Sequence, residues 1–119
     1  GRLINQMPVL MAVQAANCSP LIQVTNPDEP AKEGETLAEG IRIIKPLRWD
    51  EIRETITSNN FPVQLVEEEK IRRGQRALAE QGIFAEMTSS VVWNAYEQNK
   101  ADLPGPVVVL ISGHGLKSA

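Results

Sequence analysis

The sequence predicts an α/β fold in which a mainly parallel sheet of about four strands is flanked by helices. Four short apolar segments (residues 7–14, 61–66, 83–85 and 107–111) alternate with helical patterns, and this alternation is typical of parallel sheets. The segment 107–111 consists of five consecutive apolar residues, as expected for a strand buried on both faces. With 119 residues, the chain predicts a single α/β domain over 1–119.

In the first third of the chain, we expect one strand and one short helix. The segment MPVLMAVQ, residues 7–14, predicts the strand. Ser19 and Pro20 suit the cap and the first position of a helix over 20–25. The polar segment 28–34 predicts a surface loop.

The middle third predicts a helical turn over 36–40, a short extended segment over 41–44 and a longer helix over 48–58. The long helix follows from the helical spacing of its apolar residues, Trp49, Ile52 and Ile56, between polar neighbours. The next strand is expected over 61–66.

The last third begins with a strongly helical segment over 67–81. Three glutamates open it, where the helix dipole favours anions, and Gly82 suits its C-terminal cap. A short strand over 83–85 and a helix capped by Thr88 follow. A turn over 103–106 leads into the apolar strand 107–111.

Charge and composition argue against several classes of function. The net charge of −3 and the pI of about 5.2 argue against nucleic acid or an anionic membrane as the partner. The longest apolar run is too short to span a bilayer, and no signal-peptide pattern opens the chain. The single cysteine, Cys18, cannot form an internal disulfide and predicts a small buried residue in a reducing, cytoplasmic compartment. We expect no metal site.

Two polar stretches are candidates for chemistry. Residues 86–90 follow one predicted strand, and residues 112–115 follow another. Because the carboxyl ends of parallel strands meet at one edge of a sheet, Glu86, Thr88 and Ser112 are expected to converge on one ligand. Gly113 would let that ligand approach the backbone. Alternatively, Thr88 and Ser89 only cap a helix, and Ser112 and Gly113 only form a turn. His114 is interpreted as a loop residue without catalytic duty.

These stretches also carry a family resemblance. The segments IFAEMTSSVVWNA and VVVLISGHGLK resemble the C-terminal part of threonine synthases, which are fold type II pyridoxal-phosphate enzymes. The resemblance continues through PVLMAVQAANCSPLI and ETLAEGIRI, so it covers nearly the whole chain. Ser112 stands where many members have threonine, Met87 replaces a proline and Ser90 replaces an alanine.

The resemblance implies a role for four residues in cofactor binding. Ser112 matches the hydroxyl that hydrogen-bonds the pyridine nitrogen of pyridoxal 5'-phosphate. A hydroxyl does not hold that nitrogen protonated, so the ring is a milder electron sink. Glu86 matches a residue close to the ring, Thr88 would shape its pocket, and Gly113 would lie beside it.

The resemblance also implies that essential parts lie elsewhere. The family's Schiff-base lysine belongs to an N-terminal motif that is absent here, and the phosphate-binding glycine-rich loop is absent as well. The five lysines of this chain fall in other contexts: Lys32, Lys45, Lys70, Lys100 and Lys117. We therefore expect a C-terminal fragment of a larger cofactor-binding domain, with no catalytic residue and no bound cofactor of its own.

The implied parent is a lyase of amino-acid biosynthesis that converts O-phosphohomoserine and water to threonine and phosphate. Its missing N-terminal half is the expected partner, and the isolated chain is expected to self-associate as a homodimer. Three alternatives stay open: a non-catalytic regulatory or interaction module, another fold type II enzyme acting on a different amino acid, and a small nucleotide-binding domain that uses Gly113 and Gly115.

Overall fold

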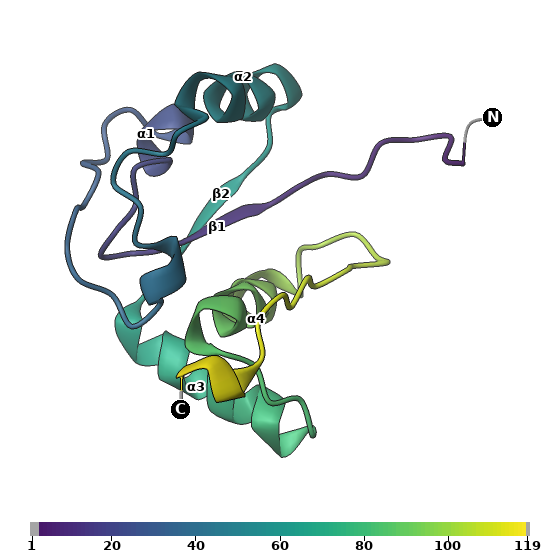
Figure 1. Cartoon of the computed structure of the whole chain (residues 1–119). Helices are drawn as coiled ribbons and strands as arrows, with labels where there is room; N and C mark the ends of the chain where they lie inside the picture. Colours follow the sequence, from purple (N-terminus) through teal and green to yellow (C-terminus); the bar gives the residue numbers. More distant parts are fainter. Residues whose placement is uncertain (1–2, 119) are drawn as a thin grey trace.

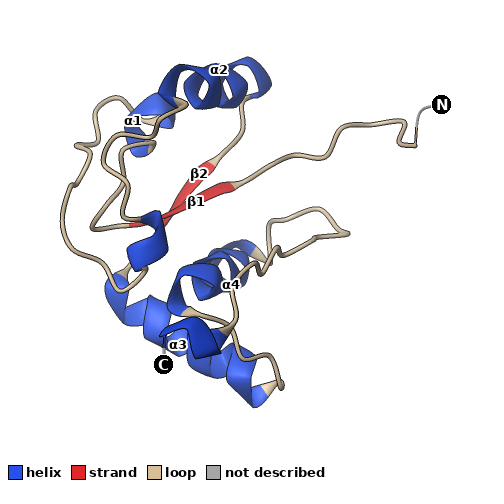
Figure 2. Ribbon diagram, in the orientation of Figure 1, coloured by secondary structure: helices blue, strands red, loops and turns tan. Residues whose placement is uncertain are grey.

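A computed structural model describes residues 3–118 of the chain. It contains two strands, four α-helices and two 3-10 turns among these residues (Figures 1 and 2). In chain order they are β1 (Ala12–Ala15), α1 (Ile22–Thr25), η1 (Glu39–Ile41), α2 (Trp49–Asn59), β2 (Val63–Val66), α3 (Glu68–Glu80), α4 (Met87–Asn99) and η2 (Gly115–Ser118).

The two strands form a parallel sheet at the centre of the fold. Ala12 pairs with Val63, and the register continues to the pair of Ala15 and Val66. Helices α1 and α2 lie on one side of the strands, and α3 and α4 lie on the other (Figure 1). Ala15 and Val66 are completely buried because helices cover them. The core combines these strand residues with the residue before η1 and with side chains from α3 and α4: Ala38, Ile71, Val91 and Ala95.

Helices α3 and α4 pack closely against each other. Ile71 and Leu78 of α3 and Val91 of α4 are fully buried. Gly74 of α3 faces Asn94 of α4, whose buried side chain donates a hydrogen bond from Nδ2 to the carbonyl of Ser90 at 3.1 Å. A side chain larger than hydrogen at residue 74 would collide with this amide, so the glycine sets the distance between the helices.

The α/β class and the parallel pairing agree with the sequence prediction, and so do helices α2 and α3. Gly82 has a φ of +81° just beyond α3, which is the left-handed conformation expected of a C-terminal glycine cap. The helical turn expected over 36–40 forms slightly later, at Glu39–Ile41. The expected extended segment over 41–44 is not a strand.

The strand predicted over 107–111 is wrong. The described backbone there has no strand partner, and the side chains of Val108 and Leu110 are 90% and 76% exposed. Residues 83–85 form no strand either; Ala85 makes one isolated bridge. The first strand is confined to Ala12–Ala15, and residues 7–10 continue as an arm away from the sheet (Figure 1). An apolar segment becomes a strand only where a neighbouring backbone pairs with it.

The prediction that Thr88 caps a helix is also wrong. Helix α4 begins at Met87, the cap position is Glu86 with an extended backbone, and no side chain caps the helix there. Thr88 lies in the first turn, and its hydroxyl oxygen accepts a hydrogen bond from the backbone N–H of Gly40 instead. Cys18 is fully buried, as expected.

Within residues 3–118, no helix combines the length and the apolar character needed to cross a membrane.

Candidate functional site

The two polar stretches singled out in the sequence lie side by side. The backbone N–H of Glu86 donates to the carbonyl of Gly113 at 3.0 Å, and the N–H of Gly115 donates to the carbonyl of Phe84 at 2.8 Å. Between them, Ala85 and His114 form an antiparallel bridge. The stretches therefore meet as expected, although the geometry differs from the prediction: they pair antiparallel and do not follow two parallel strands.

Glu86 and Gly113 are in direct contact. The side chain of Glu86 lies over the α-carbon of Gly113, and a Cβ at residue 113 would collide with the glutamate carboxyl group. Gly113 is buried. The glycine is needed here for the close approach of the Glu86 side chain.

Ser112 is an exposed residue whose hydroxyl contacts the first turn of α4. Its Oγ lies 3.4 Å from Oγ of Ser89, a residue of the first turn of α4 that is 4% exposed. Ser89 also accepts a hydrogen bond from the backbone N–H of Gly113 at 2.7 Å. One buried hydroxyl thus contacts two consecutive residues of the C-terminal stretch. The sequence motifs did not identify Ser89 as a site residue, although its place beside Thr88 in the 86–90 stretch is the signal that could have done so.

Thr88 lies on another side of α4. Its Oγ1 accepts the N–H of Gly40 at 3.1 Å, and a Cβ at residue 40 would lie 3.0 Å from that oxygen. This contact joins the start of α4 to η1. Thr88 and Ser112 consequently do not point at one another, because Ser112 faces Ser89.

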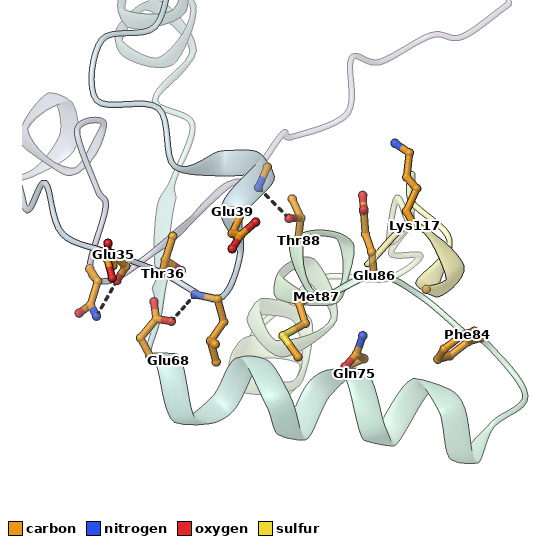
Figure 3. Close-up of a pocket in the computed structure, with 14 residues that line it drawn as sticks. Glu35, Thr36, Glu39, Glu68, Gln75, Phe84, Glu86, Met87, Thr88 and Lys117 are labelled. Carbon is orange, nitrogen blue, oxygen red and sulfur yellow. Dashed lines mark hydrogen bonds between the residues drawn. The ribbon is translucent and has the colours of Figure 1, made fainter. Parts of the chain in front are cut away.

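A pocket of about 990 Å³ opens between η1, the starts of α3 and α4, and the C-terminal turn (Figure 3). Glu86 and Thr88 line it, whereas Ser112 and Gly113 are not among its lining residues. The structure thus brings two of the four predicted site residues into the pocket. The other two are outside its lining, where Gly113 contacts Glu86 and Ser112 contacts Ser89.

The pocket is strongly acidic. Four glutamates and one lysine line it: Glu35, Glu39, Glu68, Glu86 and Lys117. Glu68 lies at the start of α3, and its Oε2 accepts a hydrogen bond of 2.8 Å from the backbone N–H of Leu37. Its other oxygen, Oε1, is buried and has no hydrogen-bond partner within the described residues. Across residues 3–118, no group of three histidine, cysteine or carboxylate side chains could hold a metal ion.

The side chain of His114 makes contacts that hold the C-terminal turn together. Its Nδ1 accepts the N–H of Leu116 at 3.2 Å, and its ring meets Phe84 edge-on with centroids 5.7 Å apart. Both contacts fix the C-terminal turn against residues 84–86. They agree with the interpretation of His114 as a loop residue.

Comparison with known proteins decides the family. The sequence model of the family "Pyridoxal-phosphate dependent enzyme" matches residues 2–113, almost the entire chain. The chain belongs to this family. The fold type II resemblance recognised in the sequence is thereby confirmed.

Several curated proteins named threonine synthase are similar to this member of the pyridoxal-phosphate family. The protein from Synechocystis sp. is 33% identical over 116 residues, which are 95% of this chain and 29% of that protein. The proteins from Methanocaldococcus jannaschii and Mycobacterium tuberculosis are each 28% identical, over 97% of this chain and 31% and 32% of their own lengths. The chain therefore spans about a third of the length of the curated relatives it matches.

The described residues fit one side of the family's cofactor. The hydroxyl of the exposed residue Ser112 can donate to a ring nitrogen, and it contacts the buried hydroxyl of Ser89. The acidic pocket, in contrast, is unsuited to a phosphate group, since four carboxylates would repel it. The phosphate of the cofactor requires N–H groups or cations from other residues.

Proposed function

We propose that this chain is the C-terminal portion of a pyridoxal-phosphate dependent threonine synthase. The parent enzyme would be a lyase of amino-acid biosynthesis that acts in the cytoplasm on O-phosphohomoserine, releasing phosphate and forming threonine with water. The curated relatives named threonine synthase support this substrate, and the family match supports the cofactor.

One observation carries the proposal. The antiparallel pairing of residues 84–86 with 113–115 places the exposed hydroxyl of Ser112 at the edge of a site that also contains Glu86. These are the two stretches whose sequences resemble the family's cofactor motifs. Ala85 and His114, which form the bridge between the two segments, are 29 residues apart in the sequence. The sequence motifs alone do not impose this contact, so it supports a shared role.

Each residue would make a different contribution. When bound, the cofactor supplies an electron-withdrawing ring. Ser112 would donate a hydrogen bond to the ring nitrogen without protonating it. Gly113 would hold the backbone close, Glu86 would lie beside the ring, and Thr88 would keep η1 against the start of α4 through its bond to Gly40.

The remaining parts of the active site would come from the rest of the parent enzyme. The chain covers about a third of its relatives' length, and its lysines do not match the family's Schiff-base motif. The N-terminal half is therefore the proposed partner, contributing the lysine and the phosphate-binding loop. The chain alone would be inactive.

We also propose that the isolated chain forms a homodimer. Both strands of the two-stranded sheet have one partner only among the described residues, so each leaves a backbone edge open. Large apolar side chains are exposed on the arm and on the C-terminal segment: Leu3, Met7, Val9, Val108 and Leu110. Exposed edges and apolar side chains of this kind promote association between chains.

The test is made on the full-length protein that contains this chain. Purified with pyridoxal phosphate, it should absorb in the visible range, become covalently labelled on a lysine outside this chain after borohydride reduction, and release phosphate from O-phosphohomoserine. Cofactor binding without phosphate release would overturn the threonine synthase assignment and favour another amino-acid substrate. Absence of cofactor binding would favour a regulatory or interaction module.

A further inference from the structure

Ser89 connects α4 to the C-terminal stretch through its side chain alone. Its Oγ accepts the N–H of Gly113 at 2.7 Å and lies 3.4 Å from Oγ of Ser112. The side chain is 4% exposed, so water does not compete freely for it. A buried hydroxyl with two partners in consecutive residues holds both of them in a fixed relation to the helix.

The hydrogen bond from Gly113 leaves the hydrogen of the Ser89 hydroxyl available for the contact with Ser112. A serine hydroxyl has one hydrogen to donate and two lone pairs. The N–H of Gly113 can only donate, so it occupies one lone pair and leaves the Ser89 hydrogen available. In the contact of 3.4 Å between Oγ of Ser89 and Oγ of Ser112, either hydroxyl can be the donor. Donation by Ser89 gives its buried hydrogen an acceptor and leaves the hydrogen of the exposed Ser112 free, so we take Ser89 as the donor.

The direction of the hydrogen bond between Ser89 and Ser112 determines whether the Ser112 hydroxyl is free to donate to a ligand. If Ser112 accepts from Ser89, its own hydrogen is free to point away from Ser89. Ser112 is exposed, so that hydrogen can reach a ligand. An unprotonated aromatic nitrogen is a pure acceptor and needs such a donor.

We propose that Ser89 is a positioning residue that orients the Ser112 hydroxyl as a hydrogen-bond donor to the ring nitrogen of the cofactor. This inference rests on the proposed function, because it takes the ligand of Ser112 from there. Ser89 does not touch the ring. It acts by fixing the backbone at Gly113 and by occupying a lone pair of Ser112.

Thr88, the residue before Ser89, joins the start of α4 to η1. Its hydroxyl oxygen accepts a hydrogen bond from the backbone N–H of Gly40 at 3.1 Å. This contact helps to hold the first turn of α4, and Ser89 with it, in position.

The experiment uses the full-length holoprotein loaded with pyridoxal phosphate that carries ¹⁵N in its ring. The variants are Ser89→Ala, Ser89→Thr and Ser112→Ala. Ser90→Ala is the matched control, since it removes a neighbouring serine hydroxyl that contacts neither Ser112 nor Gly113. The readouts are the ¹⁵N chemical shift of the ring and the hydrogen-exchange rate of the Gly113 amide.

We expect Ser89→Ala to move the ring ¹⁵N resonance in the same direction as Ser112→Ala and to accelerate Gly113 exchange roughly fivefold. In the Ser112→Ala background, the further change Ser89→Ala should leave the resonance unmoved. Ser89→Thr, which keeps the hydroxyl, should restore both readouts, and Ser90→Ala should alter neither. If Ser89→Ala does not fold, Ser89→Cys replaces it, because a thiol is a weak donor in the same place.

The outcomes separate this inference from the proposed function. Faster Gly113 exchange with an unmoved ring resonance in Ser89→Ala, while Ser112→Ala moves it, would mean that Ser89 has a structural role only. A resonance unmoved by both variants would show that Ser112 does not contact the ring. A holoprotein that takes up no cofactor would refute the proposed function and this inference together.

Discussion

Replacing Gly74 by alanine tests whether the close packing of α3 against α4 depends on this glycine. Helix propensity alone predicts stabilisation, since glycine in a helix interior costs about 1 kcal/mol relative to alanine. The structure predicts the opposite, because the new methyl group would collide with the buried side chain of Asn94. Overpacking costs about 1–3 kcal/mol, and displacing Asn94 from its bond to Ser90 costs about 1 kcal/mol more. The gain of about 1 kcal/mol in helix propensity offsets the loss of this bond, so we expect Gly74→Ala to lower the free energy of unfolding by about 1–3 kcal/mol.

Urea unfolding and thermal melting measure this effect, and a loss of that size lowers Tm by roughly 4–12 °C. In the double variant Gly74→Ala/Asn94→Ala, the collision is absent, so the two substitutions should be less harmful together than their sum. Arg72→Ala, on the exposed face of the same helix, is the control and should change stability by no more than about 0.5 kcal/mol. A Gly74→Ala protein more stable than wild type would refute the close packing of the two helices.

Three further predictions concern the proposed function. In the full-length enzyme, Ser112→Ala should lower the rate of phosphate release strongly, whereas Ser112→Thr keeps the hydroxyl and should be mild; equal rates for alanine and wild type would reduce Ser112 to a turn residue. The isolated chain should show no turnover and no stoichiometric labelling of one lysine after borohydride reduction with the cofactor, as mapped by mass spectrometry. Light scattering over a concentration series should detect self-association of the isolated chain, and a monomer at every concentration would contradict the predicted dimer.

The helices were predictable because their information is local. The spacing of Trp49, Ile52 and Ile56 places α2 within one residue of its observed ends, and the glutamates and Gly82 mark both ends of α3. Propensity, periodicity and caps are all properties of neighbouring residues. The strands were less predictable because a strand depends on a partner that is distant in the sequence.

The candidate site shows the same limit. Sequence motifs identified Glu86, Thr88 and Ser112, but they did not reveal that residues 84–86 and 113–115 pair antiparallel. The acidic lining of the pocket was also missed, since Glu35 and Glu39 come from a loop and a turn far from α4 in the sequence. Only the tertiary fold places these carboxylates around the same pocket as Glu86 (Figure 3).

Residues 107–111, which the sequence predicted as a strand, expose apolar side chains to solvent. These five apolar residues suit a strand covered on both faces, yet Val108 and Leu110 are exposed to solvent. The arm that precedes β1 has the same conflict, because Met7 and Val9 are apolar and about three-quarters exposed. Burying four such side chains would contribute about 1.5–3 kcal/mol each, which is large compared with the stability of a small domain. Both segments therefore have sequences suited to contacts that residues 3–118 do not supply, and this supports the proposal that further protein, from the parent enzyme or a second copy, covers them.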